Sequence, residues 1–162
     1  MRTLPPPQAP ARCDPRGFTL VELLATLSVI AILAFAAAPS FSGVIAAQRA
    51  RNAALDLSAA LTLARSEAVK RNATVTVATP GAWASGWTVS AGAEKVRGFG
   101  PYDGMAITAS GGSALPFGND GRPANGGAMF QVAPTAAAQA TSTVCVQLSG
   151  TGRVALVSGT CS

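Results

Sequence analysis

Glu22 is the one charged side chain in the apolar run 18–38, and its position there needs a chemical explanation. A carboxylate at the depth of a lipid bilayer costs roughly 2.5–3.5 kcal/mol on insertion scales, so it needs a positive partner and by default marks a functional site. A helix rises ~1.5 Å per residue, so these 21 residues can cross a hydrocarbon core about 30 Å thick. We therefore expect 18–38 to span a membrane as a single helix.

Other side chains that carry chemistry are sparse. The sequence contains no histidine, the commonest general base. Its three cysteines, Cys13, Cys145 and Cys161, are too far apart for the closely spaced pairs of zinc sites. There is also no phosphate-binding loop and no cluster of carboxylates. We expect no enzymatic activity, no cofactor and no metal.

The segment before the apolar run, residues 1–17, is rich in proline and carries three arginines against one aspartate. A secretory signal peptide places its small-residue cleavage site after the apolar core, whereas here the small residue, Gly17, precedes it. Cleavage at Gly17 would leave the hydrophobic segment on the mature chain. This order excludes an ordinary signal peptide, and a generic signal anchor with a stray glutamate is the alternative.

The elements that follow the apolar run are predicted from periodicity. Pro39 removes a helical hydrogen bond, which predicts a kink in the helix rather than its end. From Ala50 to Ala68, apolar residues recur at steps of three and four with most charges off that stripe, the pattern of an amphipathic helix. We expect this helix to run to about Arg71, with Asn72 as its stop signal.

After residue 72 the period changes to two, which indicates strands. Gly-rich turns separate the candidates, so we expect an antiparallel β domain over 73–162 and an α+β fold. The predicted strands are Thr74–Val77, Trp87–Ser90, Glu94–Arg97, Met105–Ala109, Ala114–Phe117, Met129–Ala133, Thr143–Leu148 and Arg153–Val157. The predicted divisions of the chain are a leader at 1–17, an apolar helix at 18–38, its amphipathic continuation at 39–72 and the β domain at 73–162.

Residues 17–22, Gly-Phe-Thr-Leu-Val-Glu, resemble the prepilin-peptidase site of type IV pilins and type II secretion pseudopilins. The resemblance implies that this peptidase cuts between Gly17 and Phe18 and N-methylates Phe18. Glu22 is then the fifth residue of the mature chain. In a filament of parallel helices, its carboxylate would neutralise the N-terminal ammonium of a neighbouring subunit, which supplies the positive partner that Glu22 lacks.

The rest of the chain is similar to the GspH/FimT family of minor pilins and pseudopilins. The similarity implies a type IV pilin-like fold and a single pass through the bacterial inner membrane, with the globular domain in the periplasm. It also implies partnership with prepilin peptidase and with other major and minor pilins or pseudopilins. The matching segments are Leu63–Asn72, Val75–Val77, Gly86 with Trp87, the turn from Phe117 to Gly121, and Cys145 with Gly152, Arg153 and Val154.

Removal of the leader would also remove Cys13, which leaves Cys145 and Cys161 as an even pair in a region outside the cytoplasm. We predict that these two form a disulfide, since exported domains favour such bridges. Two unpaired buried thiols are the alternative.

Two functions remain open for such a chain. The favoured one is a minor subunit that assembles into a type IV pilus or a type II secretion pseudopilus and primes or caps the filament. The alternative is a DNA-binding minor pilin for DNA uptake in natural transformation. The family's DNA binders carry Gly-Arg-x-Arg between the two cysteines, but residues 152–155 lack the second arginine. Beyond residue 38 the nine basic residues only modestly outnumber the five acidic ones. The candidate phosphate contacts are Arg153, Arg122, Lys95 and Arg97.

Overall fold

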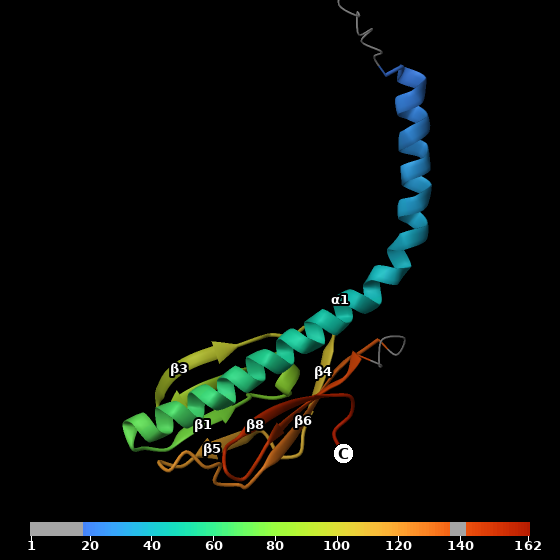
Figure 1. Ribbon diagram of the computed structural model, residues 1–162. Coiled ribbons are helices and arrows are strands. Elements are labelled where there is room, and N and C mark those ends of the chain that lie inside the picture. The colour runs from blue at the N-terminus through green and yellow to red at the C-terminus, as the bar shows by residue number, and fades with distance from the viewer. Residues whose placement is uncertain (1–17, 137–141) are drawn as a thin grey trace, which may run out of the picture. The chain divides into compact units, whose positions relative to one another are not determined.

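The computed structural model describes residues 18–136 and 142–162, except for the side chains of residues 36–41. The predicted leader, with Gly17 and Cys13, lies outside the described residues. The chain divides into two compact units, one up to Ala38 and one from Pro39 onward, and each is considered by itself. Helix α1 (Leu20–Arg71) contributes to both units (Figure 1).

The start of α1 is set by a local side-chain interaction. The backbone N–H of Glu22 donates a hydrogen bond to the Oγ1 atom of Thr19 at 3.2 Å. A threonine three residues before a glutamate is the spacing of a capping box, in which the hydroxyl accepts from an N–H that the helix leaves unpaired. A carboxylate in the first turn also complements the positive end of the helix dipole. Glu22 therefore has a local role in addition to the predicted assembly role.

The end of α1 confirms the predicted stop at Asn72. This residue adopts a left-handed backbone conformation with φ of 50°. The N–H of Ala73 donates to the carbonyl of Ala68 at 3.2 Å, and the N–H of Asn72 donates to the carbonyl of Val69 at 3.3 Å. These two bonds form a Schellman-type cap, which asparagine tolerates because it enters the left-handed region more readily than most residues.

The predicted kink concerns Pro39, whose side chain lies outside the described residues. The structure therefore does not test the kink. It does assign helical backbone through this position, and α1 continues to Arg71 as the periodicity predicted.

Eight antiparallel strands follow the helix in the described part of the chain, so the α+β prediction is confirmed. They form two sheets of four strands: sheet 1 has the order β3-β2-β1-β5, and sheet 2 has the order β4-β6-β7-β8 (Figure 1). A short 3₁₀ helix, η1 (Trp83–Ser85), precedes β2. The strand bounds are β1 (Val75–Ala78), β2 (Trp87–Ala91), β3 (Glu94–Phe99), β4 (Met105–Ala109), β5 (Ala114–Phe117), β6 (Ala128–Pro134), β7 (Val144–Leu148) and β8 (Val154–Ser158).

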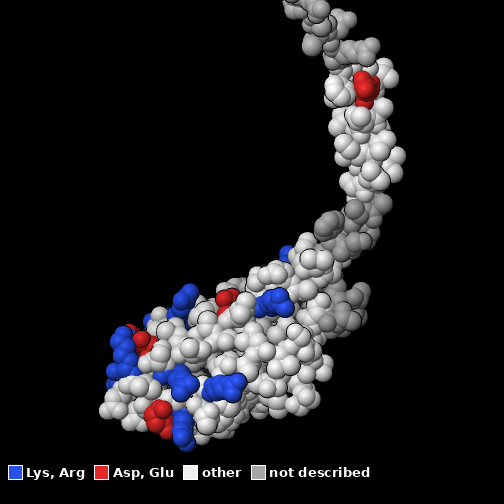
Figure 2. Space-filling view, in the orientation of Figure 1, with Lys and Arg blue, Asp and Glu red and all other residues white. Residues whose placement is uncertain are grey.

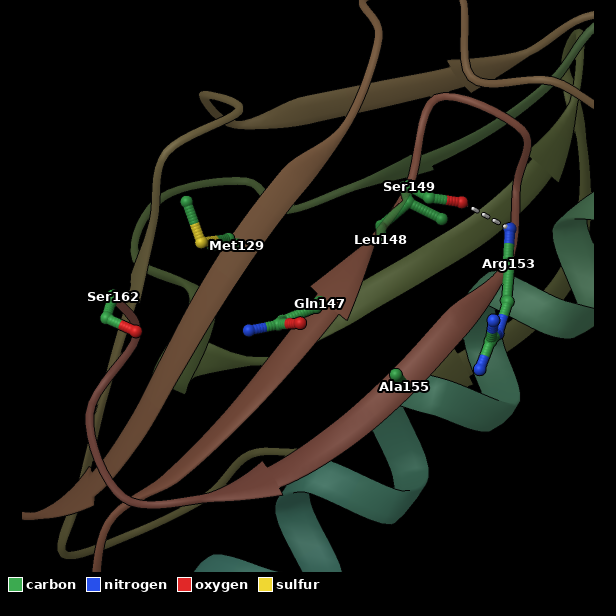
Figure 3. Close-up of a pocket in the computed structure, with 7 residues that line it drawn as sticks. All are labelled: Met129, Gln147, Leu148, Ser149, Arg153, Ala155 and Ser162. Carbon is green, nitrogen blue, oxygen red and sulfur yellow. Dashed lines mark hydrogen bonds between the residues drawn. The ribbon is translucent and has the colours of Figure 1, made fainter.

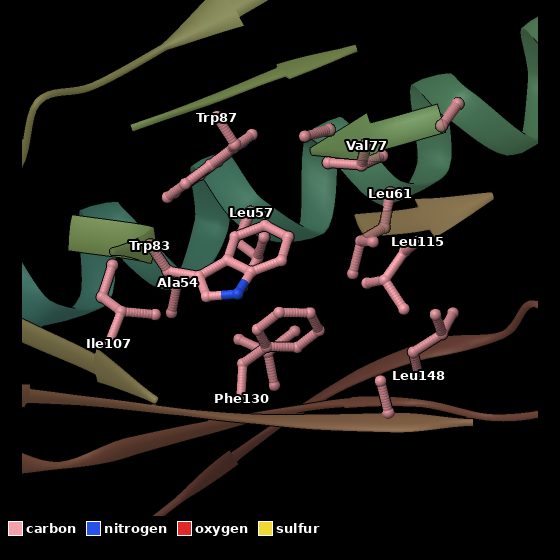
Figure 4. Close-up of a cluster of buried hydrophobic side chains, with 14 of the residues drawn as sticks. Ala54, Leu57, Leu61, Val77, Trp83, Trp87, Ile107, Leu115, Phe130 and Leu148 are labelled. Carbon is pink, nitrogen blue, oxygen red and sulfur yellow. The ribbon is translucent and has the colours of Figure 1, made fainter. Parts of the chain in front are cut away.

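One hydrophobic core joins the second half of α1 to both sheets (Figure 4). Trp83 packs edge-on against Phe130 of sheet 2, with ring centroids 4.9 Å apart, and its indole N–H donates to the carbonyl of Gly112 at 2.9 Å. The helix face in this core is mostly alanine, which lets the helix axis approach the sheets closely. The fully buried residues of that face are Ala50, Ala53, Ala54, Leu57, Ala60, Leu61, Ala64 and Ala68.

A close contact between two turns fixes one end of the β domain. Gly152, in the turn between β7 and β8, has φ of +78° and lies so near Gly121 that an added Cβ would collide with the Gly121 carbonyl oxygen. The carbonyl of Gly152 accepts a hydrogen bond from Nη1 of Arg65 at 3.2 Å. Helix α1, the connection after β5 and the turn before β8 therefore meet at one point.

We expect Gly152→Ala to destabilise the β domain more than Gly112→Ala. Gly112 has φ of +80° but no atom within 4 Å of a built Cβ, so alanine there carries only the left-handed penalty of about 1–2 kcal/mol. At Gly152 the collision adds an overpacking cost of about 1–3 kcal/mol. Urea unfolding of the detergent-solubilised chain, followed by tryptophan fluorescence, measures both. Equal losses of stability would contradict the close contact.

Candidate assembly and processing site

The described N-terminal part of the chain, residues 18–35, is apolar on every side. Its large hydrophobic side chains are each more than half exposed. A helix that is hydrophobic all round is normally surrounded by apolar groups. This segment is therefore suited to apolar surroundings. The exposed residues are Phe18, Leu20, Val21, Leu23, Leu24, Leu27, Val29, Ile30, Ile32, Leu33 and Phe35.

Among the described residues, no helix is both long and apolar enough to cross a membrane. The predicted membrane span 18–38 therefore stays a prediction.

Glu22 is the only charged residue among residues 18–35. Within the described chain its carboxylate forms no ion pair, although its backbone N–H caps the helix on Thr19. Phe18, the residue that would become the mature N-terminus, is 78% exposed. The carboxylate is thus available to a positive group from another molecule. The capping role of Thr19 escaped the sequence analysis, although Thr19-x-x-Glu22 was a visible signal for it.

A charge network anchors the end of α1 to β3. Arg71 donates from Nε to Glu67 at 2.7 Å and grips Glu94 of β3 through Nη1 at 2.7 Å and Nη2 at 3.1 Å. The hydrogen bonds from Arg71 hold the pKa values of Glu67 and Glu94 below their usual range, and the bond to Glu94 is the main cause of the raised pKa of Arg71. All three groups are therefore charged, and each glutamate is paired with Arg71. These ion pairs fix the position of the end of α1 on β3.

A second polar contact ties the helix to the loop before β4. The hydroxyl of Tyr102 donates to Oδ2 of Asp56 at 3.0 Å, and its ring stacks on Trp87 with centroids 4.8 Å apart. Burial raises the pKa of Tyr102, and the hydrogen bond to Asp56 adds to the shift. Among the described residues no three His, Cys, Asp or Glu side chains are grouped so as to hold a metal ion. The contact between Tyr102 and Asp56 fixes the position of the helix on the domain.

The predicted disulfide between Cys145 and Cys161 is present, with the two Cα atoms 5.2 Å apart. Cys145 is fully buried in β7, on the face of sheet 2 that points away from α1. The bridge closes a loop of sequence separation 16 that contains β8. It therefore fastens the chain beyond β8 to the centre of sheet 2.

The four candidate DNA contacts do not converge on one site. Lys95 and Arg97 lie on β3, at the opposite edge of sheet 1 from β5. Arg122 follows Gly121 in the connection after β5, and Arg153 follows Gly152 before β8. These two arginines are therefore next to the close contact between Gly121 and Gly152. Figure 2 shows basic side chains spread over the part of the domain that holds the end of α1, with acidic groups between them. A single phosphate-binding patch is not formed.

Comparison with known families matches residues 53–152, more than half of the chain, to the family described as type II transport protein GspH. The chain belongs to the GspH family. Residues 13–38 match the prokaryotic N-terminal methylation motif, which includes Gly17, Phe18 and Glu22. The sequence-based assignment is thereby confirmed for both parts of the chain. The matches lend no support to the DNA-binding alternative.

Solved structures share the fold of this GspH-family chain. The crystal structure of the type IV minor pilin FimU of Pseudomonas aeruginosa matches with 21% identity and a TM-score of 0.58, over 66% of this chain and 87% of FimU. The minor pseudopilin EpsH from the type 2 secretion system of Vibrio cholerae matches with 14% identity and a TM-score of 0.54, over 68% of this chain and 97% of EpsH. At these identities the likeness shows the fold. No curated protein matches the chain.

We expect Cys161→Ser to lower the free energy of unfolding by about 2–5 kcal/mol, the usual loss when a small exported domain loses a native bridge. Urea unfolding of the oxidised chain measures the change, and proteolysis should cut first in the segment beyond β8. The parent treated with a reductant serves as the matched control. If the variant and the oxidised parent unfold at the same urea concentration, the bridge does not stabilise the domain.

Proposed function

We propose that this chain is a minor subunit that assembles into a type IV pilus or a type II secretion pseudopilus, where it primes or caps the filament. The observation that carries the proposal is the segment of residues 18–35, helical from Leu20, which is apolar on every side and has Glu22 as its single charge. Such a surface suits a bundle of parallel helices. Membership of the GspH family supports the proposal, as does the fold shared with a minor pilin and a minor pseudopilin.

The proposal includes processing of the N-terminus. A prepilin peptidase would cleave between Gly17 and Phe18 and methylate the new amino group, as the match to the methylation motif indicates. Before assembly, residues 18–38 would hold the chain in the bacterial inner membrane with the β domain in the periplasm. A periplasmic location is consistent with the disulfide, since such bridges persist in oxidising compartments.

Assembly would then depend on Glu22. Its unpaired carboxylate lies one helical turn from Phe18, whose amine becomes the N-terminus after cleavage. In a bundle of staggered helices, the carboxylate of one subunit would meet the N-terminal ammonium of the next. An unpaired charge in an apolar bundle is strongly unfavourable, so each group requires the other. The charge pair would thereby fix the stagger of neighbouring subunits.

The first test concerns maturation. In cells with an active prepilin peptidase, we expect intact mass spectrometry to find a chain that begins at Phe18 and carries one N-methyl group. Replacing Gly17 with valine should block cleavage, because the peptidase requires a small residue there. Gly43→Ala is a suitable control, since Gly43 lies in α1 with open space around it. Recovery of the parent with its leader intact would contradict the proposed processing.

The second test concerns assembly. Glu22→Gln keeps the shape of the side chain and removes its charge, so it should spare membrane insertion and processing but reduce recovery in filaments by about tenfold or more. One tenfold step corresponds to about 1.4 kcal/mol, and losing one member of a buried ion pair costs about 3–5 kcal/mol. Ser28→Ala, which also changes an exposed polar side chain of this helix, should assemble normally.

The amount of each variant in sheared filaments, relative to the membrane fraction, is measured by quantitative immunoblotting. Glu22→Ala should behave like Glu22→Gln. If either variant enters filaments at the parental level, charge pairing at Glu22 does not govern assembly.

A further inference from the structure

Strand β8 forms an outer edge of sheet 2 and leaves backbone groups unpaired. The N–H of Gly159 donates to the carbonyl of Thr143 at 2.8 Å, and the N–H of Ser149 donates to the carbonyl of Arg153 at 2.9 Å. In an antiparallel ladder such bonded pairs recur at every second residue, so the odd-numbered residues of β8 bond to β7. The even-numbered residues turn their N–H and C=O groups to the free edge, where no described residue bonds to them. They are Val154, Leu156 and Ser158.

The other three sheet edges carry features that hinder pairing with a further strand, whereas the sequence of β8 carries none. Strand β3 carries three charged residues and a register shift opposite Val89 and Ser90. Strand β5 is short, contains Pro116 and bridges to Pro123 beyond its end. Strand β4 has η1 packed against it. Strand β8 reads Val-Ala-Leu-Val-Ser, with no charge, proline or bulge. Proteins rarely leave such an edge uncovered, because it pairs readily with other chains.

The exposed fractions agree with an uncovered edge. Leu156 is 39% exposed and Val157 is 45% exposed, although they point to opposite faces of the sheet. In Figure 3, β8 is the strand that carries Ala155, and helix α1 lies beyond its free side. A hollow of about 350 Å³ lies between the helix and the end of β8. Its lining residues are Val44, Ala47, Gln48, Arg51, Ser142, Thr143, Val144 and Ser158.

The charge around this edge is positive at both ends. Arg51 lines the hollow at the end of β8, and Arg153 directly precedes the first residue of β8. Arg153 also lines a second hollow, of about 450 Å³, which extends across sheet 2 to Met129 of β6 (Figure 3). Neither hollow has an acidic lining residue, and neither arginine forms an ion pair with a described residue. The acidic residues of α1 beyond residue 38, Asp56 and Glu67, bond instead to Tyr102 and Arg71.

We propose that β8 is a docking edge for an extended segment of a different protein chain, which adds to sheet 2 as a fifth strand. The segment would have an uncharged, β-branched centre of about five residues to match β8, with acidic side chains at both ends to meet Arg51 and Arg153. Backbone hydrogen bonds to Val154, Leu156 and Ser158 supply affinity, and the two arginines set the register. This inference goes beyond filament assembly through the N-terminal helix.

A second copy of this chain fits the edge less well. Two copies of β8 that pair antiparallel in one sheet are related by a two-fold axis normal to that sheet. Because the second half of α1 lies along the sheet surface, this axis would reverse its direction in the second copy. The two chains would then enter their β domains from opposite sides, and Arg51 and Arg153 would have no acidic partner. A distinct chain with acidic flanks would pair with the outward backbone groups of β8 and also supply acidic partners for Arg51 and Arg153.

The test uses the full chain in detergent micelles and a fluorescent heptapeptide, Glu-Thr-Val-Thr-Val-Thr-Glu. We expect saturable binding by fluorescence anisotropy. A matched peptide with lysine at both ends should bind about tenfold more weakly at low salt, and the difference should shrink at high salt because screening weakens exposed charge pairs. Hydrogen exchange should slow at the amides of Val154, Leu156 and Ser158, while those of Ala155 and Val157, already bonded to β7, should not change.

Leu156→Pro removes one outward N–H without breaking a bond to β7, so it should weaken peptide binding by about tenfold. Leu156→Ala keeps that N–H and should weaken binding by less than about threefold. If Leu156→Pro does not fold, Ser158→Pro makes the same change at the end of the strand. Unchanged binding by the folded proline variant would overturn the proposal, as would equal binding of the two peptides or no binding at all. Protection of the three amides with rising protein concentration alone would instead identify a second copy as the occupant.

Discussion

The constraint on which this molecule depends is that α1 presents far more apolar surface than the described chain can bury. Beyond residue 38 the alanine-rich face of α1 is covered by two sheets, while residues 18–35 stay exposed on all sides. Apolar area contributes about 25 cal/mol per Å² when it is removed from water, so an uncovered helix of this kind strongly favours association. The one charge within it, Glu22, makes that association selective, because only a partner that brings a positive group can bury it without a large cost.

The second half of α1 holds together two sheets that share no hydrogen-bonded strand pair. Small alanine side chains let the helix sit close to both sheets, and Trp83 reaches from η1 to Phe130 of sheet 2. Polar contacts then fix the position of the helix. Arg71 donates hydrogen bonds to Glu94 of β3, and Arg65 donates one to the carbonyl of Gly152 in the turn before β8. The disulfide holds the segment beyond β8. Of the four sheet edges, β8 is the one whose strand has no charge, proline or bulge.

Periodicity predicted most of the fold because the apolar stripe of α1 and the alternation of each strand follow directly from which face is buried. Strand ends differ by one or two residues from the predictions, as at β6, where pairing with β4 extends the strand to Pro134. The division into two sheets was not predictable, since it depends on which strands pair across long stretches of chain. The contact of Gly121 with Gly152, and hence the role of Arg65, has the same long-range origin.

The candidate site divides in the same way. The sequence pointed to Glu22 because a charge in an apolar run is a local feature, and the Cys145–Cys161 bridge followed from counting cysteines. The position of β8 at a sheet edge could not be predicted before the strand order was known, because a sequence such as Val-Ala-Leu-Val-Ser is compatible with a central strand as well as with an edge strand. The scatter of Lys95, Arg97, Arg122 and Arg153 over separate elements likewise depended on topology.

Carbodiimide cross-linking of isolated filaments is the most direct measurement of the central claim. The reagent joins a carboxylate to an amine only where the two are in contact. Mass spectrometry of the digested filaments should find Glu22 linked by an amide bond to the N-terminal residue of a neighbouring subunit, and detergent-solubilised monomers should lack this product. If Glu22 in filaments is instead modified by an added small amine as readily as in monomers, its carboxylate is not paired with a neighbouring N-terminus, and the account of assembly is wrong.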